Sequence, residues 1–186
     1  MQISILSGSS RLNNKTMRLA KAIRRLIPEA EIVDFAEYDI PFPNKGGVDS
    51  TNLTPFQSNL LNAFEQSHLV FVLTPEYNWF PSAELVNMIH QLATREHIHV
   101  FNNKVFAFCG VSSGAGGRIP TIHLDNIFGK ILNVFNIDSV TSPKKFEARF
   151  IAEALDENGY SLGNHEFDKG LEDFVRYSLK VADRWH

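Results

Sequence analysis

The sequence is short of several features that mark particular classes of protein. It has one cysteine, Cys109, among 186 residues, which excludes an intramolecular disulfide; its apolar surroundings predict a buried side chain. No stretch approaches the roughly 20 apolar residues of a membrane span, and no apolar leader precedes the first predicted strand. The net charge of −3 provides no basic surface for nucleic acid. We therefore expect a soluble, cytoplasmic protein that binds neither membranes nor nucleic acid.

The motifs of common nucleotide and metal sites are also lacking. There is neither a G-x-x-x-x-G-K-[ST] phosphate loop nor a G-x-G-x-x-G dinucleotide fingerprint. Among the seven histidines only His97 and His99 stand close together, and no cysteine or carboxylate completes a zinc-ligand spacing. Nucleoside triphosphates, Rossmann-bound dinucleotides and a functional metal ion are therefore disfavoured.

What the chain does have is a regular alternation of strand-like and helix-like segments. Residues 69–73 and 105–111 are continuous apolar runs, which are typical of parallel strands covered on both faces. Further strands are predicted at 2–7, 31–35 and about 137–141. The clearest helix start is Thr54 as N-cap, followed by Pro55 and by Gln57 as its capping-box partner. Other helices are predicted at 14–27, after Ser82, after Gly117 and at 167–185, with a helical piece and a turn at Asn158-Gly159 within 142–165.

This order of elements predicts a fold. Five strands alternating with helices over residues 1–186 indicate a single domain, a doubly wound three-layer α/β sandwich. Right-handed crossovers favour a five-stranded parallel sheet in the flavodoxin-like order 2-1-3-4-5. In such sheets ligands bind at the carboxyl ends of the strands, so the loops after the first, third and fourth strands are the candidate site.

The loop after the first strand has the composition of an anion site. It reads GSSRLNNKT, residues 8–16, and leads into a predicted helix whose free N–H groups attract negative charge. Ser9, Asn14 and Thr16 offer neutral donors, and Arg11 offers a positive charge. The alternative is that Asn13 or Asn14 only caps the helix.

The other two loops suit a flat ligand. In residues 74–81, TPEYNWFP, three aromatic residues could form a wall for a planar ring, with Asn78 and backbone amides as polar groups. A loop folded back on the core or a subunit interface is the alternative. In residues 112–117, SSGAGG, three glycines allow close approach of the backbone to a ligand, although a flexible turn has the same composition.

These motifs resemble those of the NAD(P)H-dependent FMN reductase family, a flavodoxin-like group that includes chromate-, quinone- and azo-reducing enzymes. The family opening G-S-x-R-x-x-S-x-N is matched by residues 8–16, with Asn14 and Thr16 as polar replacements, and the P-x-Y-N motif by residues 75–78. The family's S-x-G-x-x-G-G loop is approximated by residues 112–117, with one residue of spacing changed. The family's following L-K-N-x-x-D segment is replaced by residues 85–90, LVNMIH, which lack the lysine and the aspartate.

The resemblance implies FMN as cofactor, NAD(P)H as co-substrate and no side-chain acid or base. It implies a ping-pong transfer of two electrons to a quinone, an azo compound, a metal oxyanion or free flavin, by a homodimer or homotetramer with Trp79 and Phe80 suited to the subunit contact. The rival functions are a flavodoxin-type electron carrier, disfavoured by Arg11 and by the low net charge, and a non-enzymatic FMN-binding sensor. The cofactor-binding residues that the resemblance implies are Ser9, Arg11, Asn14, Lys15, Thr16, Pro75, Glu76, Tyr77, Asn78, Ser112, Ser113, Gly114, Gly116 and Gly117.

Overall fold

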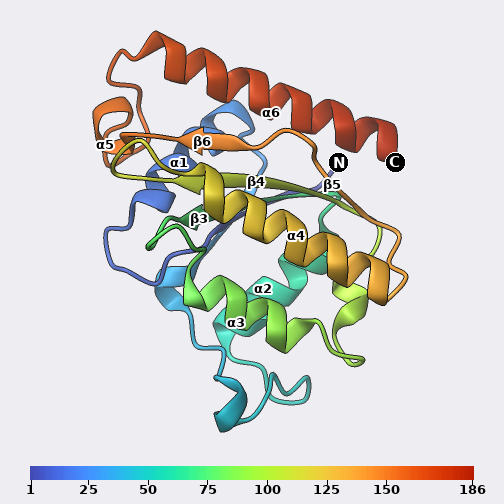
Figure 1. Ribbon diagram of the computed structural model, residues 1–186. Coiled ribbons are helices and arrows are strands. Elements are labelled where there is room, and N and C mark those ends of the chain that lie inside the picture. Colours follow the sequence, from blue (N-terminus) through green and yellow to red (C-terminus); the bar gives the residue numbers. More distant parts are fainter.

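A parallel β-sheet lies between two layers of helices in the computed structural model, which describes residues 1–186 (Figure 1). The strand order is β2-β1-β3-β4-β5, as predicted, and a sixth strand, β6, also pairs with β4. The strands are β1 Ile3–Ser7, β2 Glu31–Asp34, β3 Leu69–Pro75, β4 Val105–Val111, β5 Val140–Thr141 and β6 Phe146–Ala148.

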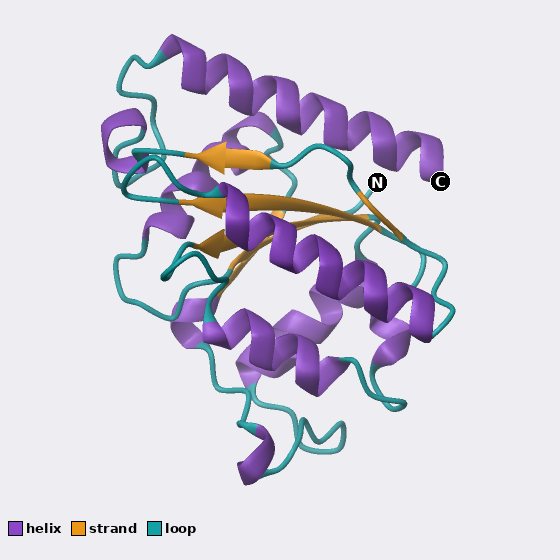
Figure 2. Cartoon of the chain, viewed as in Figure 1, coloured by secondary structure: helices purple, strands orange, loops and turns teal.

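Helices cover both faces of this sheet (Figure 2). α1, α5 and α6 pack on one face, and α2, α3 and α4 pack on the other. The helices are α1 Lys15–Leu26, α2 Pro55–Gln66, α3 Ala83–Leu92, α4 Arg118–Val134, α5 Ile151–Ala154 and α6 His165–Trp185. Three short 3₁₀ turns, Phe35–Glu37, Pro43–Lys45 and Ile98–Phe101, complete the chain. None of the helices combines the length and the apolar character needed to cross a membrane.

The central strands contribute side chains to two hydrophobic cores, one on each face of the sheet. Because successive side chains of a strand point to opposite faces, Phe71 of β3 packs with α1 and α6, whereas Val70 and Val72 pack with α2, α3 and α4. All seven residues of β3 and all seven of β4 are buried. The continuous apolar runs therefore correspond to strands covered on both faces, as predicted.

Helix starts follow their capping residues. The Thr54 hydroxyl accepts a hydrogen bond from the Gln57 N–H, and the Gln57 side-chain oxygen accepts one from the Thr54 N–H, which confirms the predicted capping box. Asn14 caps α1. The last helix, α6, begins at His165, two residues before the predicted start, because the Asn164 side chain caps it by accepting from the Phe167 N–H at 3.1 Å.

The outer edge of the sheet differs from the prediction of one strand at 137–141. β5 has two residues and pairs with the start of β4, and β6 pairs with its end, from Cys109↔Phe146 to Val111↔Ala148. Between them Pro143 has no N–H for a strand ladder, and Lys145 turns inward to the Asp125 carboxylate at 2.8 Å. The predicted helical piece is α5, and the turn at Asn158-Gly159 is present, with Gly159 at φ +76°.

Candidate functional site

The loops after β1, β3 and β4 meet at the carboxyl edge of the sheet, at the arrowheads in Figure 1. The Ser9 hydroxyl lies 3.1 Å from the Tyr77 hydroxyl, and the Lys15 ammonium donates to the Ser113 hydroxyl at 2.7 Å. These two contacts join the first loop to the second and to the third. Together the loops enclose a cavity of about 200 Å³, lined by Ser9, Arg11, Leu12, Asn13, Asn14, Lys15, Pro75, Glu76, Tyr77, Val111 and Ser113.

Of the residues predicted for this site, eight line the cavity: Ser9, Arg11, Asn14, Lys15, Pro75, Glu76, Tyr77 and Ser113. Ser112, Gly114, Gly116 and Gly117 lie in the adjoining glycine loop, and Asn78 lies at the tip of the loop after β3. Leu12, Asn13 and Val111 also line the cavity and were not predicted. The signal that the sequence offered was Leu12, an apolar residue within a polar loop.

The first loop presents donors to the cavity. The backbone N–H groups of Lys15 and Thr16, at the start of α1, donate no hydrogen bond within the protein. The exposed guanidinium of Arg11 lies 4.5 Å from the centre of the Tyr77 ring, in cation–π contact. Two cationic residues, Arg11 and Lys15, therefore line one small cavity at a helix start, which suits an anion.

Thr16 and Asn14 mainly hold this loop in shape. Thr16 is fully buried; its hydroxyl lies 2.9 Å from that of Ser7 and donates to Asn14 Oδ1 at 2.6 Å. The Asn14 amide donates to the Ser9 and Arg11 carbonyls, while its oxygen accepts from the Met17 N–H. In this structure the Thr16 side chain is engaged within the loop, and Asn14 caps α1, as the alternative interpretation expected.

The second loop is a tight hairpin. Tyr77 and Phe80 exchange two backbone hydrogen bonds of 3.0 Å around Asn78 and Trp79, whose φ angles are +49° and +68°. Two successive left-handed residues define a type I′ turn. The Phe80 ring stacks on His123 of α4 at 4.6 Å, whereas Trp79 projects into solvent with 66% of its surface exposed.

The third loop is fastened to the second by Glu76. The Gly117 N–H donates to the Glu76 carboxylate at 2.8 Å, and the Glu76 N–H donates to the Val111 carbonyl at 3.0 Å. Gly117 has φ +109°, a conformation that favours glycine. The carboxylate of Glu76 therefore fixes the distance between the two loops on either side of the cavity.

The cysteine and the close histidine pair lie outside this site. Cys109 is fully buried in β4, and burial raises the pKa of its thiol well above the usual value, so it packs as an apolar side chain. His97 is bonded to the Val48 carbonyl at 3.1 Å, and His99 lies 3.4 Å from the Glu65 carboxylate. No three His, Cys, Asp or Glu side chains are grouped to hold a metal ion.

The segment that departs from the family pattern anchors another loop. Asn87 of α3 donates to the Tyr38 hydroxyl at 2.6 Å and to the Pro41 carbonyl at 3.1 Å. Gln91, one turn later, also donates to the Pro41 carbonyl. Burial raises the pKa of Tyr38 to about 12. The polar side chains of α3 therefore hold the loop after β2 in place.

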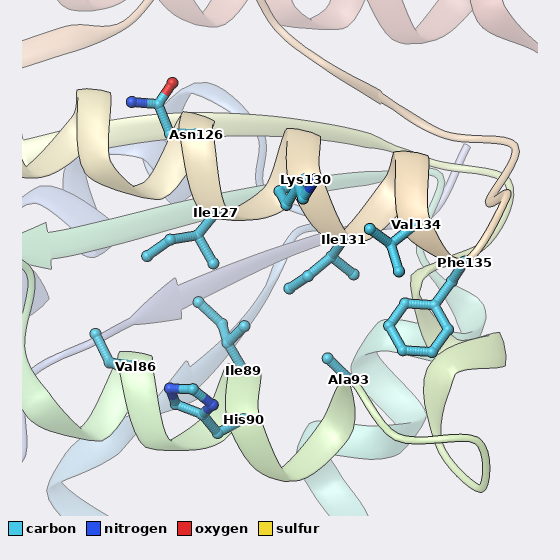
Figure 3. Close-up of a pocket in the computed structure, with 10 residues that line it drawn as sticks. All are labelled: Val86, Ile89, His90, Ala93, Asn126, Ile127, Lys130, Ile131, Val134 and Phe135. Carbon is cyan, nitrogen blue, oxygen red and sulfur yellow. The ribbon is translucent and has the colours of Figure 1, made fainter.

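An apolar groove separates α3 from α4 (Figure 3). Its volume is about 520 Å³, larger than that of the cavity between the loops. Val134 and Phe135 at the end of α4 are exposed on its wall. The lining residues are Val86, Ile89, His90, Ala93, Asn126, Ile127, Lys130, Ile131, Val134 and Phe135.

A five-stranded parallel core in this order, with the loops of β1, β3 and β4 converging, defines a flavodoxin-like protein. Residues 1–147 match the model of the NADPH-dependent FMN reductase family, and the chain belongs to that family. It is accordingly an oxidoreductase of the kind that uses FMN and NAD(P)H. A search of curated protein sequences gave no significant match.

Solved structures share the fold at low sequence identity. FerB, a flavoenzyme NAD(P)H:(acceptor) oxidoreductase from Paracoccus denitrificans, has a TM-score of 0.77 and 20% identity, over 98% of this chain and 97% of that one. RosB with bound 8-demethyl-8-formylriboflavin-5'-phosphate has a TM-score of 0.71 and 13% identity, over 99% of this chain and 79% of that one. An NADPH-quinone reductase from P. pentosaceus has a TM-score of 0.62 and 12% identity, over 96% of this chain and 98% of that one.

Proposed function

We propose that this protein binds FMN in the cavity between the three loops and passes two electrons, in a ping-pong cycle, from NAD(P)H to a small acceptor. The acceptor classes compatible with the family are quinones, azo compounds, metal oxyanions and free flavin. The observation that carries the proposal is the convergence of Arg11, Lys15 and unpaired N–H groups with a glycine loop at one sheet edge.

The phosphate end of FMN fits the cavity at the start of α1. The N–H group of Lys15 and the hydroxyl of Ser9 would supply neutral donors, and Arg11 and Lys15 would supply charge. The volume of about 200 Å³ is below the roughly 300–1,000 Å³ of a whole-ligand pocket. The cavity therefore suits the phosphate and ribityl end, and the ring would lie on the more open surface beside it.

The ring would lie between the hairpin and the glycine loop. Residues 75–78 would run along its edge, and residues 113–117 would meet its pyrimidine end. The N–H groups of Ser113, Ala115 and Gly116 donate no hydrogen bond within the protein, so they are free to stabilise negative charge there. Bound FMN supplies the electron-transfer chemistry. No side-chain acid or base is required of this chain.

The family expectation of a homodimer or homotetramer has a candidate surface. We infer that a second copy covers the groove between α3 and α4, because Val134 and Phe135 expose apolar surface beside Ile127 and Ile131. Subunit contact would therefore be made by helices rather than by the hairpin.

A visible spectrum of the purified protein tests the proposed function. We expect the protein to take up FMN on titration, to be bleached by NADPH or NADH, and to sustain NAD(P)H oxidation when a quinone is added. FMN binding without sustained oxidation would instead support a flavodoxin-type carrier or a sensor. A protein that takes up no FMN would contradict the proposal.

A further inference from the structure

Trp79 holds a backbone conformation that its side chain disfavours. Of the six non-glycine residues with positive φ, four are asparagines, which tolerate this region; the other two are Trp79, at +68°, and Phe150, at +46°. Asparagine or glycine is the usual occupant of such positions. Both aromatic residues are also exposed, Trp79 by 66% and Phe150 by 45%. Neither gains the full burial that ordinarily offsets such strain.

The two strained residues are attached to the same glycine loop. The hairpin that carries Trp79 is joined to this loop through the bond between Glu76 and the Gly117 N–H. Phe150 donates its own N–H to the Gly114 carbonyl at 3.0 Å. Trp79 and Phe150 therefore belong to segments that flank the proposed ring site. Trp79 lies in the loop after β3, and Phe150 follows β6.

The surroundings hold both segments in place. The base of the hairpin is fixed on its far side by Ser82, whose N–H donates to the Thr74 hydroxyl at 3.3 Å. Phe80 is stacked on His123 of α4. Beyond Phe150, the Ile151 N–H donates to the Ser112 carbonyl at 3.2 Å. Strain that is held by its surroundings at a ligand site indicates a functional use of the strained side chain.

We propose that Trp79 and Phe150 bind the electron acceptor and select planar aromatic acceptors over compact inorganic ones. This inference rests on the proposed function, and it assigns specificity to two residues that the family motifs leave out. A flat quinone gains stacking contact with an aromatic side chain, whereas a compact ion has no flat face to stack. One aromatic contact of this kind changes affinity by about 2- to 13-fold.

The test compares Trp79→Asn, Phe150→Asn and the double variant with the wild type, using menadione and ferricyanide as acceptors. Asparagine suits the left-handed backbone but removes the aromatic ring. We expect the ratio of kcat/KM for menadione to that for ferricyanide to fall about 3- to 10-fold in each single variant. We expect the melting temperature of the apoprotein to rise by roughly 2–4 °C in Trp79→Asn, because strain is relieved.

Matched controls remove exposed aromatic rings elsewhere. Trp185 at the end of α6 and Phe42 in the loop after β2 are also exposed. Trp185→Asn and Phe42→Asn should leave the acceptor ratio at its wild-type value. Trp79→Phe, which keeps an aromatic ring, should retain most of the preference for menadione.

The following results would overturn the inference. An unchanged acceptor ratio in the double variant would show that the rings do not contact the acceptor. A lower melting temperature in Trp79→Asn, or a smaller assembly in gel filtration, would show that Trp79 stabilises the fold or a subunit contact instead. A wild type that takes up FMN and oxidises NAD(P)H while the ratio stays constant would leave the proposed function standing and reject this inference alone. A wild type that reduces neither acceptor would reject both.

Discussion

Glu76 and Gly117 are joined by a 2.8 Å hydrogen bond from the Gly117 N–H to the Glu76 carboxylate. This bond links the hairpin after β3 to the glycine loop after β4. Gly116 passes so close that a Cβ atom there would lie 1.6 Å from Glu76 Oε2. A hydrogen bond to a carboxylate is stronger than one between neutral groups, so the relative position of the two loops depends on this side chain.

Removing that link should weaken cofactor binding. Glu76→Ala is expected to raise the Kd for FMN by about 3- to 10-fold, because the loops lose one charge-assisted hydrogen bond that orders them. Glu76→Gln keeps an oxygen acceptor and should show a smaller loss. Isothermal titration of the apoprotein with FMN measures both; equal affinity in Glu76→Ala and the wild type would contradict the ordering role.

Arg11 should contribute to binding of the FMN phosphate. In Arg11→Ala one charged donor is lost from the cavity, and a hydrogen bond to a charged group is worth about 1.5–3 kcal/mol. We expect FMN affinity to fall by about 10- to 100-fold. Arg24→Ala, which removes an exposed arginine near the other end of α1, is the matched control. If Arg11→Ala binds FMN like this control, the phosphate lies elsewhere.

Two Gly→Ala substitutions should have opposite effects on stability. At Gly110 an added Cβ would lie 1.8 Å from the Gly117 carbonyl oxygen, so backbone must move; we expect a loss of about 3 kcal/mol. At Gly129, inside α4, an added Cβ would meet no side chain and no backbone beyond its own helix turn within 4 Å, and alanine should stabilise the helix by about 0.5–1 kcal/mol. Urea unfolding of the two variants measures the difference, and a tolerated Gly110→Ala would contradict the close packing.

Lys104 should make stability depend on pH in the alkaline range. Burial lowers its pKa from 10.5 to about 8, so between these values the unfolded chain binds more protons than the folded one. Below pH 8 the lysine is charged in both states, and burial of that charge destabilises the folded protein in full. The free energy of unfolding therefore rises as the pH increases from about 8 to 10.5. Lys104→Met should stabilise the protein by about 1–2 kcal/mol at pH 7, after allowance for its lost hydrogen bond to the Asn102 carbonyl.

The check on this prediction is unfolding at two pH values. The gain from Lys104→Met should be largest at pH 7 and close to absent above about pH 10.5. Lys180→Met, at an exposed position of α6, should change stability little at either pH. A gain that is independent of pH would mean that packing, rather than charge, accounts for the effect.

The groove between α3 and α4 should govern assembly. Val134→Lys places a charge on its exposed apolar wall and is expected to shift the protein to monomer in sedimentation experiments, because burying an unpaired charge is costly. Asn133→Lys adds the same charge one residue earlier, outside the groove lining, and should leave assembly unchanged. An identical sedimentation profile for the wild type and both variants would exclude the groove as the interface.

The sheet order and the meeting of the loops could be predicted because the patterns were local and strong. The continuous apolar runs of β3 and β4 report burial on both faces, and Thr54 with Gln57 marks a helix start without reference to distant residues. Once the strands are parallel and in this order, their carboxyl ends lie together. The contacts of Ser9 with Tyr77 and of Lys15 with Ser113 follow from that topology.

What could not be predicted depended on contacts between distant segments. A threonine at the start of a helix gives the same sequence signal whether its hydroxyl faces a ligand or, as for Thr16, the buried hydroxyl of Ser7. Between β5 and β6, Lys145 reaches Asp125 of α4, a partner 20 positions away that the local sequence pattern does not reveal. The left-handed backbone of Trp79 is set by the hairpin around it, and residue type alone argued against it.

The divided edge of the sheet has a consequence for how copies of this chain can meet. β5 and β6 have two and three residues, and the opposite edge strand, β2, has four. Neither edge of the sheet presents a long row of unpaired backbone groups to which a neighbouring molecule could add a strand. Pro143 and Lys144 interrupt the edge that β5 and β6 form. These short edges oppose aggregation by strand pairing, so a folded molecule is a poor template for the addition of unfolded chains even at high concentration.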